Sequence, residues 1–411
     1  MKQFYAWTLA LLVGALFGWL SLDWLNATLD FVATVYTRLF QFLAVPTLVL
    51  TIATTLASIT KGQDIGRVFR RTITYTLLTT AAASAVGLVL FITIAPGVLP
   101  EGVVSAFASD EVMAMRQNPS YTEHILRIVP NNLIAPFLAG DVLSLLLIAS
   151  AVGLALSVMP ASDGRTTVIN FLRGILDVLL TLIRSLIRTL PLAICAFTAL
   201  LVVQMRDGIA AEALGRYTLV VLGSNLLQFF VVLPLFLLSR RLNPLKVLGG
   251  MMPAVLTALF TKSSVATLPV TVQSAEQRVG VNPKISRFIL PICTTINMNG
   301  CAAFILITSL FVMQQSGIQL TGGMMALWFL LSIISAVGNA GVPMGCYFLT
   351  FSLMTGVGAN VAVLGLILPI YTVIDMVETA VNVWSDSCVC AMTNHDLRGL
   401  EEEDAETQRN L

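Results

Sequence analysis

Charged side chains are scarce in this sequence. Asp, Glu, Lys and Arg make up 11% of the 411 residues, whereas hydrophobic residues make up 57%. Soluble domains carry about 25% charged residues, so this deficit excludes a soluble globular protein. A net charge of +1 provides no basic surface for a nucleic-acid partner. Apolar runs of about 20 residues or more recur along the chain, which predicts a multi-span protein of the lipid bilayer.

The sequence also lacks the motifs of several enzyme classes. It has no Walker A loop, no HExxH motif and no GxSxG motif, so ATP-driven pumping and metal- or serine-dependent hydrolysis have no machinery here. It has two histidines and six cysteines, and no two cysteines form a CxxC pair. This pattern argues against a zinc site, and the cysteines are expected to act as small apolar residues. We therefore predict neither an enzyme nor an organic cofactor.

Hydropathy predicts eight membrane spans, at 4–22, 27–58, 72–95, 133–158, 166–203, 217–238, 287–312 and 360–393. Two further apolar stretches are interrupted midway, the first by FTKSSVATLP and the second by SAVGNAGVPMG. Non-helical backbone at membrane depth is tolerated only inside protein or beside a cavity. A pair of interrupted segments is typical of secondary transporters with inverted repeats. Short loops outside the membrane are the alternative.

Basic connecting segments predict the orientation of the chain. Lys61 and Arg70 follow the second span, whereas the acidic segment 96–132 falls on the opposite side. Because basic loops favour the cytoplasm, both termini are expected there. The polar tail, 395–411, is expected to be disordered.

The last span carries five polar residues at helical spacing: Asp375, Glu378, Thr379, Asn382 and Asp386. At about 100° per residue they fall within roughly 100° of arc on one helix face. A carboxylate at the bilayer centre costs about 2.5–3.5 kcal/mol if it faces lipid. We therefore expect this face to line a polar chamber. A contact between subunits with internally paired acids is the alternative.

The charge of this face predicts a bound cation. Three carboxylates stand against one intramembrane lysine, Lys262, so a metal ion or an ammonium group is needed for balance. Sodium, a hard cation, prefers oxygen ligands. In the seventh span, Asn297, Asn299 and Gly300 favour a local break that would turn carbonyl oxygens toward an ion. Lys262 either neutralises an acid of the last span or extends to the cytoplasm.

Four motifs occur in order along the chain: TKSSVATLPVT, INMNG, GNAGVP and DMVETAVNVWSD. With YTRLFQFLAVPTLVL in the second span, they closely resemble the dicarboxylate/amino acid:cation symporters, the glutamate transporter homologues, over essentially the whole chain. The resemblance implies an all-α membrane protein with eight transmembrane helices and two re-entrant helical hairpins. It also implies a homotrimer with an elevator mechanism, in the bacterial inner membrane.

The resemblance further implies a division into domains. A scaffold would comprise 1–71 and, after an extracellular loop, the rest of 96–205. A moving transport domain would comprise 72–95 and 206–394, followed by the cytoplasmic tail 395–411.

Site residues are carried over individually. Asp375 matches the aspartate that holds the substrate ammonium group, Ser264 and Asn382 match groups that bind the α-carboxylate, and Asp386 matches a sodium-ligand aspartate. The implied substrate-binding set is Ser263, Ser264, Cys301, Gly341, Val342, Pro343, Gly345, Asp375, Glu378, Thr379 and Asn382, with 341–343 at the tip of an extracellular gate. The implied sodium ligands are Thr79, Thr80, Asn297, Asn299, Asn382 and Asp386, and Lys262 would compensate charge.

Three departures from the family bear on the substrate. Glu378 replaces an arginine that would form a bidentate contact with a side-chain carboxylate, so aspartate and glutamate should be rejected. Asn299 replaces an aspartate and weakens one sodium site, and Cys301 replaces a threonine and makes the pocket less polar. The pattern DxxETAxN with TKSS resembles the bacterial sodium/serine–threonine symporter branch.

These features predict sodium-coupled uptake of serine, threonine or alanine. Sodium- or proton-coupled transport of a cationic or other amino acid is the alternative, and an ion channel is the rival from another class.

Overall fold

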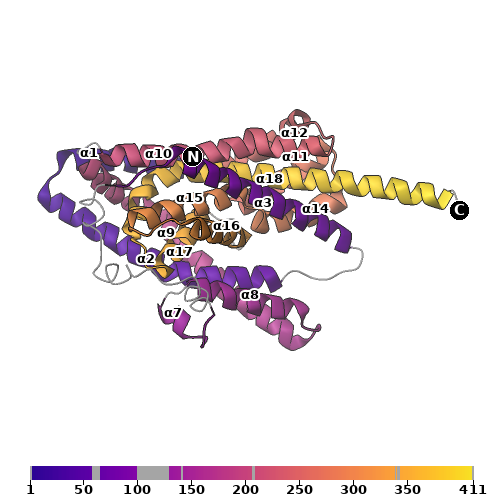
Figure 1. Cartoon of the computed structure of the whole chain (residues 1–411), viewed down its shortest axis with the longest axis horizontal. Coiled ribbons are helices and arrows are strands. Elements are labelled where there is room, and N and C mark those ends of the chain that lie inside the picture. The colour runs from indigo at the N-terminus through magenta and orange to yellow at the C-terminus, as the bar shows by residue number, and fades with distance from the viewer. Residues whose placement is uncertain are drawn as a thin grey trace.

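The computed structural model describes residues 2–57, 65–99, 129–139, 142–205, 209–337, 339 and 343–409. These residues form helices and connecting segments, and no strand occurs among them (Figure 1). Within the same residues, six helical stretches are long and apolar enough to cross a membrane by length and composition. Each of the eight spans predicted from hydropathy coincides with a helix or with consecutive helices.

The first five spans correspond to α1 (Lys2–Leu20), α2 (Asp23–Ala57), α3 (Ile65–Ile94), α8 (Val142–Val158) and α9 (Asp163–Met205). The short helix α7 (Ala135–Ala139) precedes α8, which is therefore shorter than the predicted fourth span. The sixth span consists of three helical segments that follow one another without a break: α10 (Ile209–Leu227), η1 (Gln228–Val232) and α11 (Leu233–Ser239). The seventh comprises α14 (Pro283–Ile296) and α15 (Asn299–Gln315), and the eighth is α18 (Ala362–Arg409).

Both interrupted stretches are helix pairs. The first consists of α12 (Pro244–Thr261) and α13 (Ser264–Ser274), which is continued by η2 (Ala275–Val279). Lys262 ends α12 in the left-handed conformation, at φ 54°, and the Ser263 side chain accepts a hydrogen bond from the Ala266 N–H to cap α13. The second pair is α16 (Gly322–Val337) and α17 (Gly345–Gly356). The helices therefore break at the polar or glycine-rich tips, as predicted.

The polar tail differs from its prediction. Disorder was expected for 395–411, but α18 continues to Arg409. Alanine, leucine and glutamate, which are strong helix formers, recur in this segment, and they extend a helix that is already nucleated. Most of the acidic segment that we predicted outside the cell lies outside the described residues.

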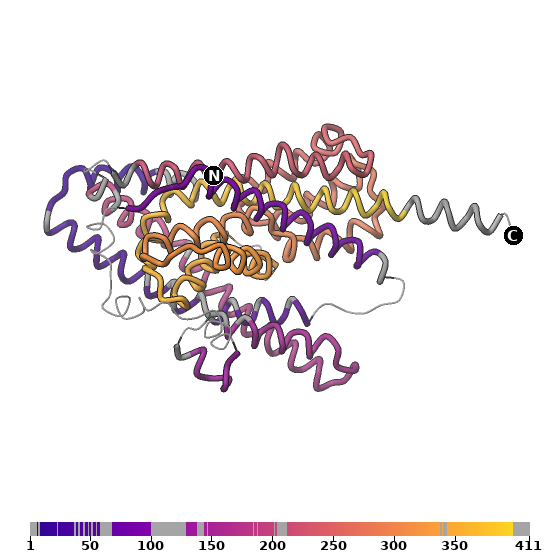
Figure 2. Tube along the Cα trace, viewed as in Figure 1, coloured from indigo at the N-terminus to yellow at the C-terminus, as the bar shows by residue number. Residues whose placement is uncertain are grey.

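Helix contacts define two groups of elements. In one, α1 and α2 pack against α9, and α2 also packs against α8. In the other, α15 contacts α3, α10 and α18, while α12, α13 and α14 also contact α18. Figures 1 and 2 show α18 running lengthwise through the body, with α8 on one side and α11 and α12 on the opposite side. The second group surrounds the polar face of α18 and so positions the site.

Candidate functional site

The polar face of α18 is buried within a single chain. Asp375, Glu378, Thr379, Asn382 and Asp386 are 4%, 1%, 5%, 3% and 1% exposed. None of them therefore faces outward, and no second subunit is needed to cover them. Buried carboxylates require partners of opposite charge or hydrogen-bond donors, so the partners supplied by neighbouring helices define what this face can bind.

One cluster forms where the seventh span breaks. Asn297 ends α14 with φ −108° and ψ 64°, outside the helical region, and α15 starts at Asn299. The Asn297 side chain donates to Asp386 Oδ1 at 2.9 Å and to Ser385 Oγ at 2.9 Å. Thr79 Oγ1 of α3 lies 3.2 Å from Asn297 Oδ1. The predicted helix break is confirmed, and it brings amide, hydroxyl and carboxylate groups together.

The same cluster includes the next pair of residues. Thr80 Oγ1 donates to Asn299 Oδ1 at 2.9 Å, and the Asn299 amide donates to Ser385 Oγ. Asp386 Oδ2 is buried and has no hydrogen-bond partner within the described part of the chain. An unpaired buried carboxylate oxygen is costly, whereas hard cations prefer such oxygens as ligands. The geometry therefore provides a place for a cation beside Asp386.

A second cluster lies about two turns earlier on α18. The Met344 N–H, just before α17, donates to Asp375 Oδ2 at 3.3 Å. The Tyr371 hydroxyl lies 3.4 Å from Asp375 Oδ1 and 3.1 Å from Glu378 Oε2. Glu378 Oε1 is buried and has no partner among the described residues. Two carboxyl groups thus share one tyrosine hydroxyl.

Asn382 connects the two clusters. Its Oδ1 accepts a hydrogen bond from the Gly300 N–H at 2.8 Å, and its Nδ2 lies 3.4 Å from Cys301 Sγ. The Thr379 hydroxyl instead donates to the Asp375 carbonyl oxygen at 2.7 Å. That bond satisfies the hydroxyl proton within α18, whereas Asn382 faces the start of α15.

Gly300 allows α15 to approach α18 closely. A Cβ at this position would lie 2.9 Å from both Glu378 Cα and the Glu378 carbonyl oxygen. Because these are backbone atoms, Gly300→Ala is expected to force the helices apart and to lower the free energy of unfolding by about 1–3 kcal/mol. Thermal unfolding of the purified protein measures this. Gly215→Ala on α10 is the control, because no heavy atom lies within 4 Å of a Cβ there. Equal melting temperatures for the two variants would contradict the close-approach argument.

The tip of the first helix pair lies near the second cluster. Lys262 is buried, and its Nζ donates to the Thr372 carbonyl oxygen at 2.5 Å, three residues before Asp375. In this structure the Lys262 side chain is therefore held inside the protein, against α18. Ser263 and Ser264, which begin α13, are buried as well.

The predicted gate tip is described in part. Gly341 and Val342 lie outside the described residues, whereas Pro343 and Gly345 flank Met344. A Cβ on Gly345 would come within 2.4 Å of Asn339 Oδ1. The amide of Asn339 therefore occupies the space that this glycine leaves open.

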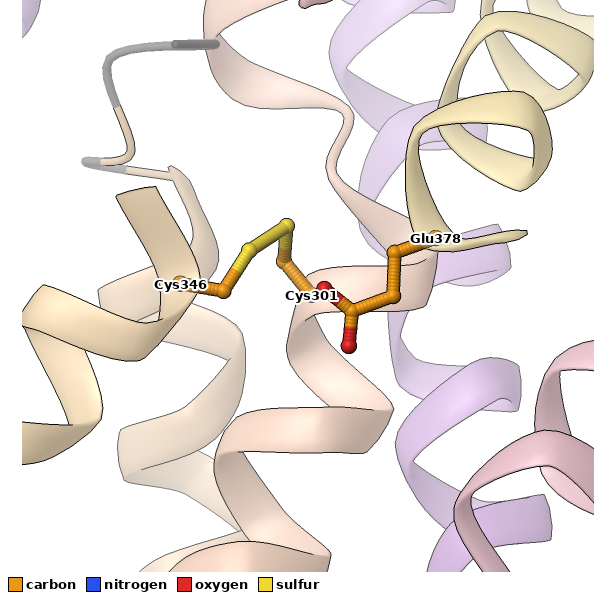
Figure 3. A group of neighbouring side chains, drawn as sticks. All are labelled: Cys301, Cys346 and Glu378. Carbon is orange, nitrogen blue, oxygen red and sulfur yellow. A yellow bond between two sulfur atoms is a disulfide. The ribbon is translucent and has the colours of Figure 1, made fainter. Parts of the chain in front are cut away.

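The cysteine prediction is partly wrong. Cys195, Cys293, Cys388 and Cys390 are free, but Cys301 and Cys346 form a disulfide beside Glu378 (Figure 3). These two residues are separated by 45 positions in the sequence, so their spacing gave no signal. They meet because α15 packs against α17.

Sequence reasoning also missed three polar residues of the site. Tyr371 lies one helical turn before Asp375 and so could have been found from the polar face of α18. Ser385 and Asn339 lie inside the motifs DMVETAVNVWSD and GNAGVP, but no role was assigned to either of them from the sequence.

Buried carboxyl, amide and hydroxyl groups gathered where a membrane helix is broken are typical of secondary active transporters. The model of the Sodium:dicarboxylate symporter family matches residues 4–396, and the chain belongs to this family. The protein is therefore a sodium-coupled transporter and not an enzyme, and its fold is the all-α membrane fold that the sequence predicted.

Named relatives include carriers of two kinds. The chain is 28% identical to a Caenorhabditis elegans protein named as a sodium-dependent excitatory amino acid transporter, covering 89% of this chain and 82% of the relative. It is 25% identical to rabbit excitatory amino acid transporter 3, covering 98% and 87%. It is 31% identical to human neutral amino acid transporter A, where the match covers 62% of this chain and 48% of the relative.

Proposed function

We propose that this protein couples sodium entry to the uptake of a small neutral amino acid such as serine, threonine or alanine. The observation that carries the proposal is the buried pair of Asp375 and Glu378 around Tyr371. Asp375 would bind the ammonium group of the amino acid, while Asn382 and Ser264 would bind its carboxylate. The similarity to a neutral amino acid transporter supports this substrate class.

Glu378 would select the side chain of the substrate. Its Oε1 has no partner in the described chain, so a substrate hydroxyl could donate to it. An acidic side chain would instead meet two like charges in a buried site, which is strongly unfavourable. A cationic side chain would pair with Glu378, and for this reason a basic amino acid is the second candidate.

Sodium would bind at the first cluster. Asp386 Oδ2 supplies an unpaired carboxylate oxygen, and the side-chain oxygens of Asn297, Asn299, Thr79 and Thr80 lie in the same network. Because Asn382 contacts the start of α15 beside this network, binding at either cluster would favour the same arrangement of α15. Such shared ordering is a route to thermodynamic coupling between ion and amino acid.

The transport cycle would follow an elevator mechanism in a homotrimer. The contacts of α1, α2, α8 and α9 with one another support a scaffold, and the packing around α18 supports a separate transport domain. The pairs α12–α13 and α16–α17 would be the re-entrant hairpins. The resemblance of DxxETAxN and TKSS to the bacterial sodium/serine–threonine symporters supports a bacterial inner membrane as the location. The basic segments support an orientation with both termini in the cytoplasm.

Uptake of labelled serine into proteoliposomes tests the proposal. Uptake should saturate, require an inward sodium gradient, and be competed by threonine and alanine but not by aspartate or glutamate. Competition by lysine or arginine alone would favour the second candidate. Non-saturating flux with electrical current and no gradient requirement would identify a channel instead.

Glu378→Arg is expected to shift the substrate preference toward acidic amino acids. Arginine would restore a bidentate partner for a side-chain carboxylate, so the preference for aspartate over serine should rise by ~10- to 100-fold, which corresponds to about 1.4–2.8 kcal/mol. Competition assays at fixed sodium measure this ratio. Glu378→Gln is the matched control, because it removes the negative charge without adding a positive one. If wild type and Glu378→Arg show the same substrate preference, Glu378 does not contact the side chain of the substrate.

A further inference from the structure

Three potential metal ligands converge beside the substrate cluster. Cys301 lies on α15, Cys346 on α17 and Glu378 on α18, and Figure 3 shows the two sulfur atoms next to the glutamate carboxylate. The Sγ atoms and a carboxylate oxygen all lie within 4.8 Å of one another, and every one of these residues is buried. Helices far apart in the sequence therefore bring two sulfurs and one carboxylate to a single point.

Glu378 supplies an independent indication of a ligand. Of the two carboxylate oxygens of Glu378, Oε2 lies 3.1 Å from the Tyr371 hydroxyl, while Oε1 is buried without a partner in the described part of the chain. The side chain is 1% exposed. Buried polar atoms are rarely left unpaired, so an atom in this position is suited to bind an ion.

We propose that Cys301, Cys346 and Glu378, with the disulfide reduced, bind a thiophilic divalent cation of the Zn²⁺ or Cd²⁺ type. On binding, each thiol releases one proton, and the two thiolates and the carboxylate donate to the metal. Such an ion is bound by thiolate and carboxylate ligands, with about 2.3 Å between zinc and sulfur. Tetrahedral geometry then places the sulfurs about 3.8 Å apart, a separation compatible with Cα atoms 5.5 Å apart.

Asn339 offers a fourth ligand. Its Nδ2 lies 3.2 Å from Cys301 Sγ and 3.1 Å from Cys346 Sγ. A half-turn of the amide group would exchange this nitrogen for Oδ1 and aim an oxygen at the metal. The site would then have four ligands, as structural zinc sites do. This soft site is distinct from the sodium cluster, where all candidate ligands are oxygens.

The disulfide provides an internal control. While the two sulfurs are bonded to each other they cannot act as thiolate ligands, so the oxidised protein should not bind the metal. A phosphine reductant opens the bond: phosphorus is oxidised and takes its oxygen from water, and each sulfur receives one proton. The same protein can thus be compared with and without the proposed ligands.

Cadmium binding to the purified full-length chain tests the site directly. After reduction with a phosphine and its removal, equilibrium dialysis should detect a bound ion, and the ultraviolet Cd²⁺–thiolate absorption band should appear. Cys346→Ser and Cys301→Ser each remove a direct ligand of the metal. Each should therefore lower the Cd²⁺ affinity by more than ~100-fold, since the loss of a residue that only supports a ligand already costs ~10- to 100-fold. Cys195→Ser on α9 should bind as wild type does. Melting temperatures establish that each variant is folded.

Several results would overturn the metal site. These are no binding to the reduced wild type, equal binding to the oxidised protein, or unchanged binding in both Cys301→Ser and Cys346→Ser. Weaker Cd²⁺ affinity in Glu378→Gln, with the thiolate absorption band retained, would support the carboxylate as the third ligand. Unchanged Cd²⁺ affinity in this variant would show that Glu378 does not bind the metal.

The effect on transport rests on the proposed function. A metal at this point would occupy Glu378 and tether α17 to α15 beside Asp375, so Cd²⁺ should inhibit sodium-driven serine uptake by the reduced protein but not by Cys346→Ser. Failure of serine uptake altogether would contradict the proposed function without altering the dialysis result. Conversely, if a protein with bound Cd²⁺ takes up serine at the normal rate, the prediction that the metal inhibits transport is wrong.

Discussion

Asp375→Asn is expected to abolish high-affinity amino acid binding. Removing one member of a buried, hydrogen-bonded charge pair costs about 2–5 kcal/mol, which corresponds to a ~30- to 4,000-fold loss of affinity. Asp375 is buried on α18 and accepts hydrogen bonds from the Met344 N–H and Tyr371. Asparagine keeps the size of the side chain but removes the charge that a substrate ammonium group requires.

The hydrogen bonds that Asp375 accepts should make the loss of substrate affinity in Asp375→Asn larger than the loss from the missing charge alone. The Met344 N–H and the Tyr371 hydroxyl each point a donor at a carboxylate oxygen of Asp375. An asparagine amide offers one oxygen and one NH₂ group, so one of these donors would face another donor. The segment before α17 would thus lose a contact with α18 even without substrate.

Equilibrium binding of labelled serine at saturating sodium measures the effect. Asp177→Asn is the matched control, because it is the same substitution at an exposed position of α9. Sodium binding without substrate should persist in Asp375→Asn, since the sodium cluster around Asp386 does not include this side chain. Near-normal serine affinity in the variant would refute the assigned role.

Local periodicity accounts for what could be predicted from the sequence. The spacing of Asp375, Glu378 and Asp386 on one helix face needs only the 3.6-residue period, and all three are buried. The helix break next to Asn297 likewise follows from residue types within a few positions. Such features depend on neighbours in the sequence and are therefore readable before the fold is known.

Contacts between distant elements could not be predicted in this way. The meeting of Cys301 and Cys346 depends on how α17 packs against α15, and hydropathy contains no information on that packing. The same applies to Asn339, whose amide can lie beside the two bonded sulfurs because Gly345 leaves space for it.

Asp386→Asn is expected to weaken sodium binding first and amino acid binding as a consequence. Asp386 Oδ1 accepts a hydrogen bond from Asn297, whereas Oδ2 is free to bind an ion. Hydrogen bonds and contacts to a charged group contribute about 1.5–3 kcal/mol, so the apparent sodium affinity should fall by ~10- to 150-fold. In the proposed symporter the two bound species are coupled, so part of this loss, and at most all of it, should appear in the substrate affinity at limiting sodium.

This linkage distinguishes the two aspartates experimentally. In Asp386→Asn the loss of serine affinity should shrink as sodium is raised, because mass action refills the weakened site. In Asp375→Asn the loss should persist at every sodium concentration, since the missing charge contacts the substrate itself. Serine titrations across a range of sodium concentrations separate these patterns, with Asp30→Asn on the exposed surface of α2 as the control. A sodium dependence in Asp386→Asn equal to that of the control would show that the cation binds elsewhere.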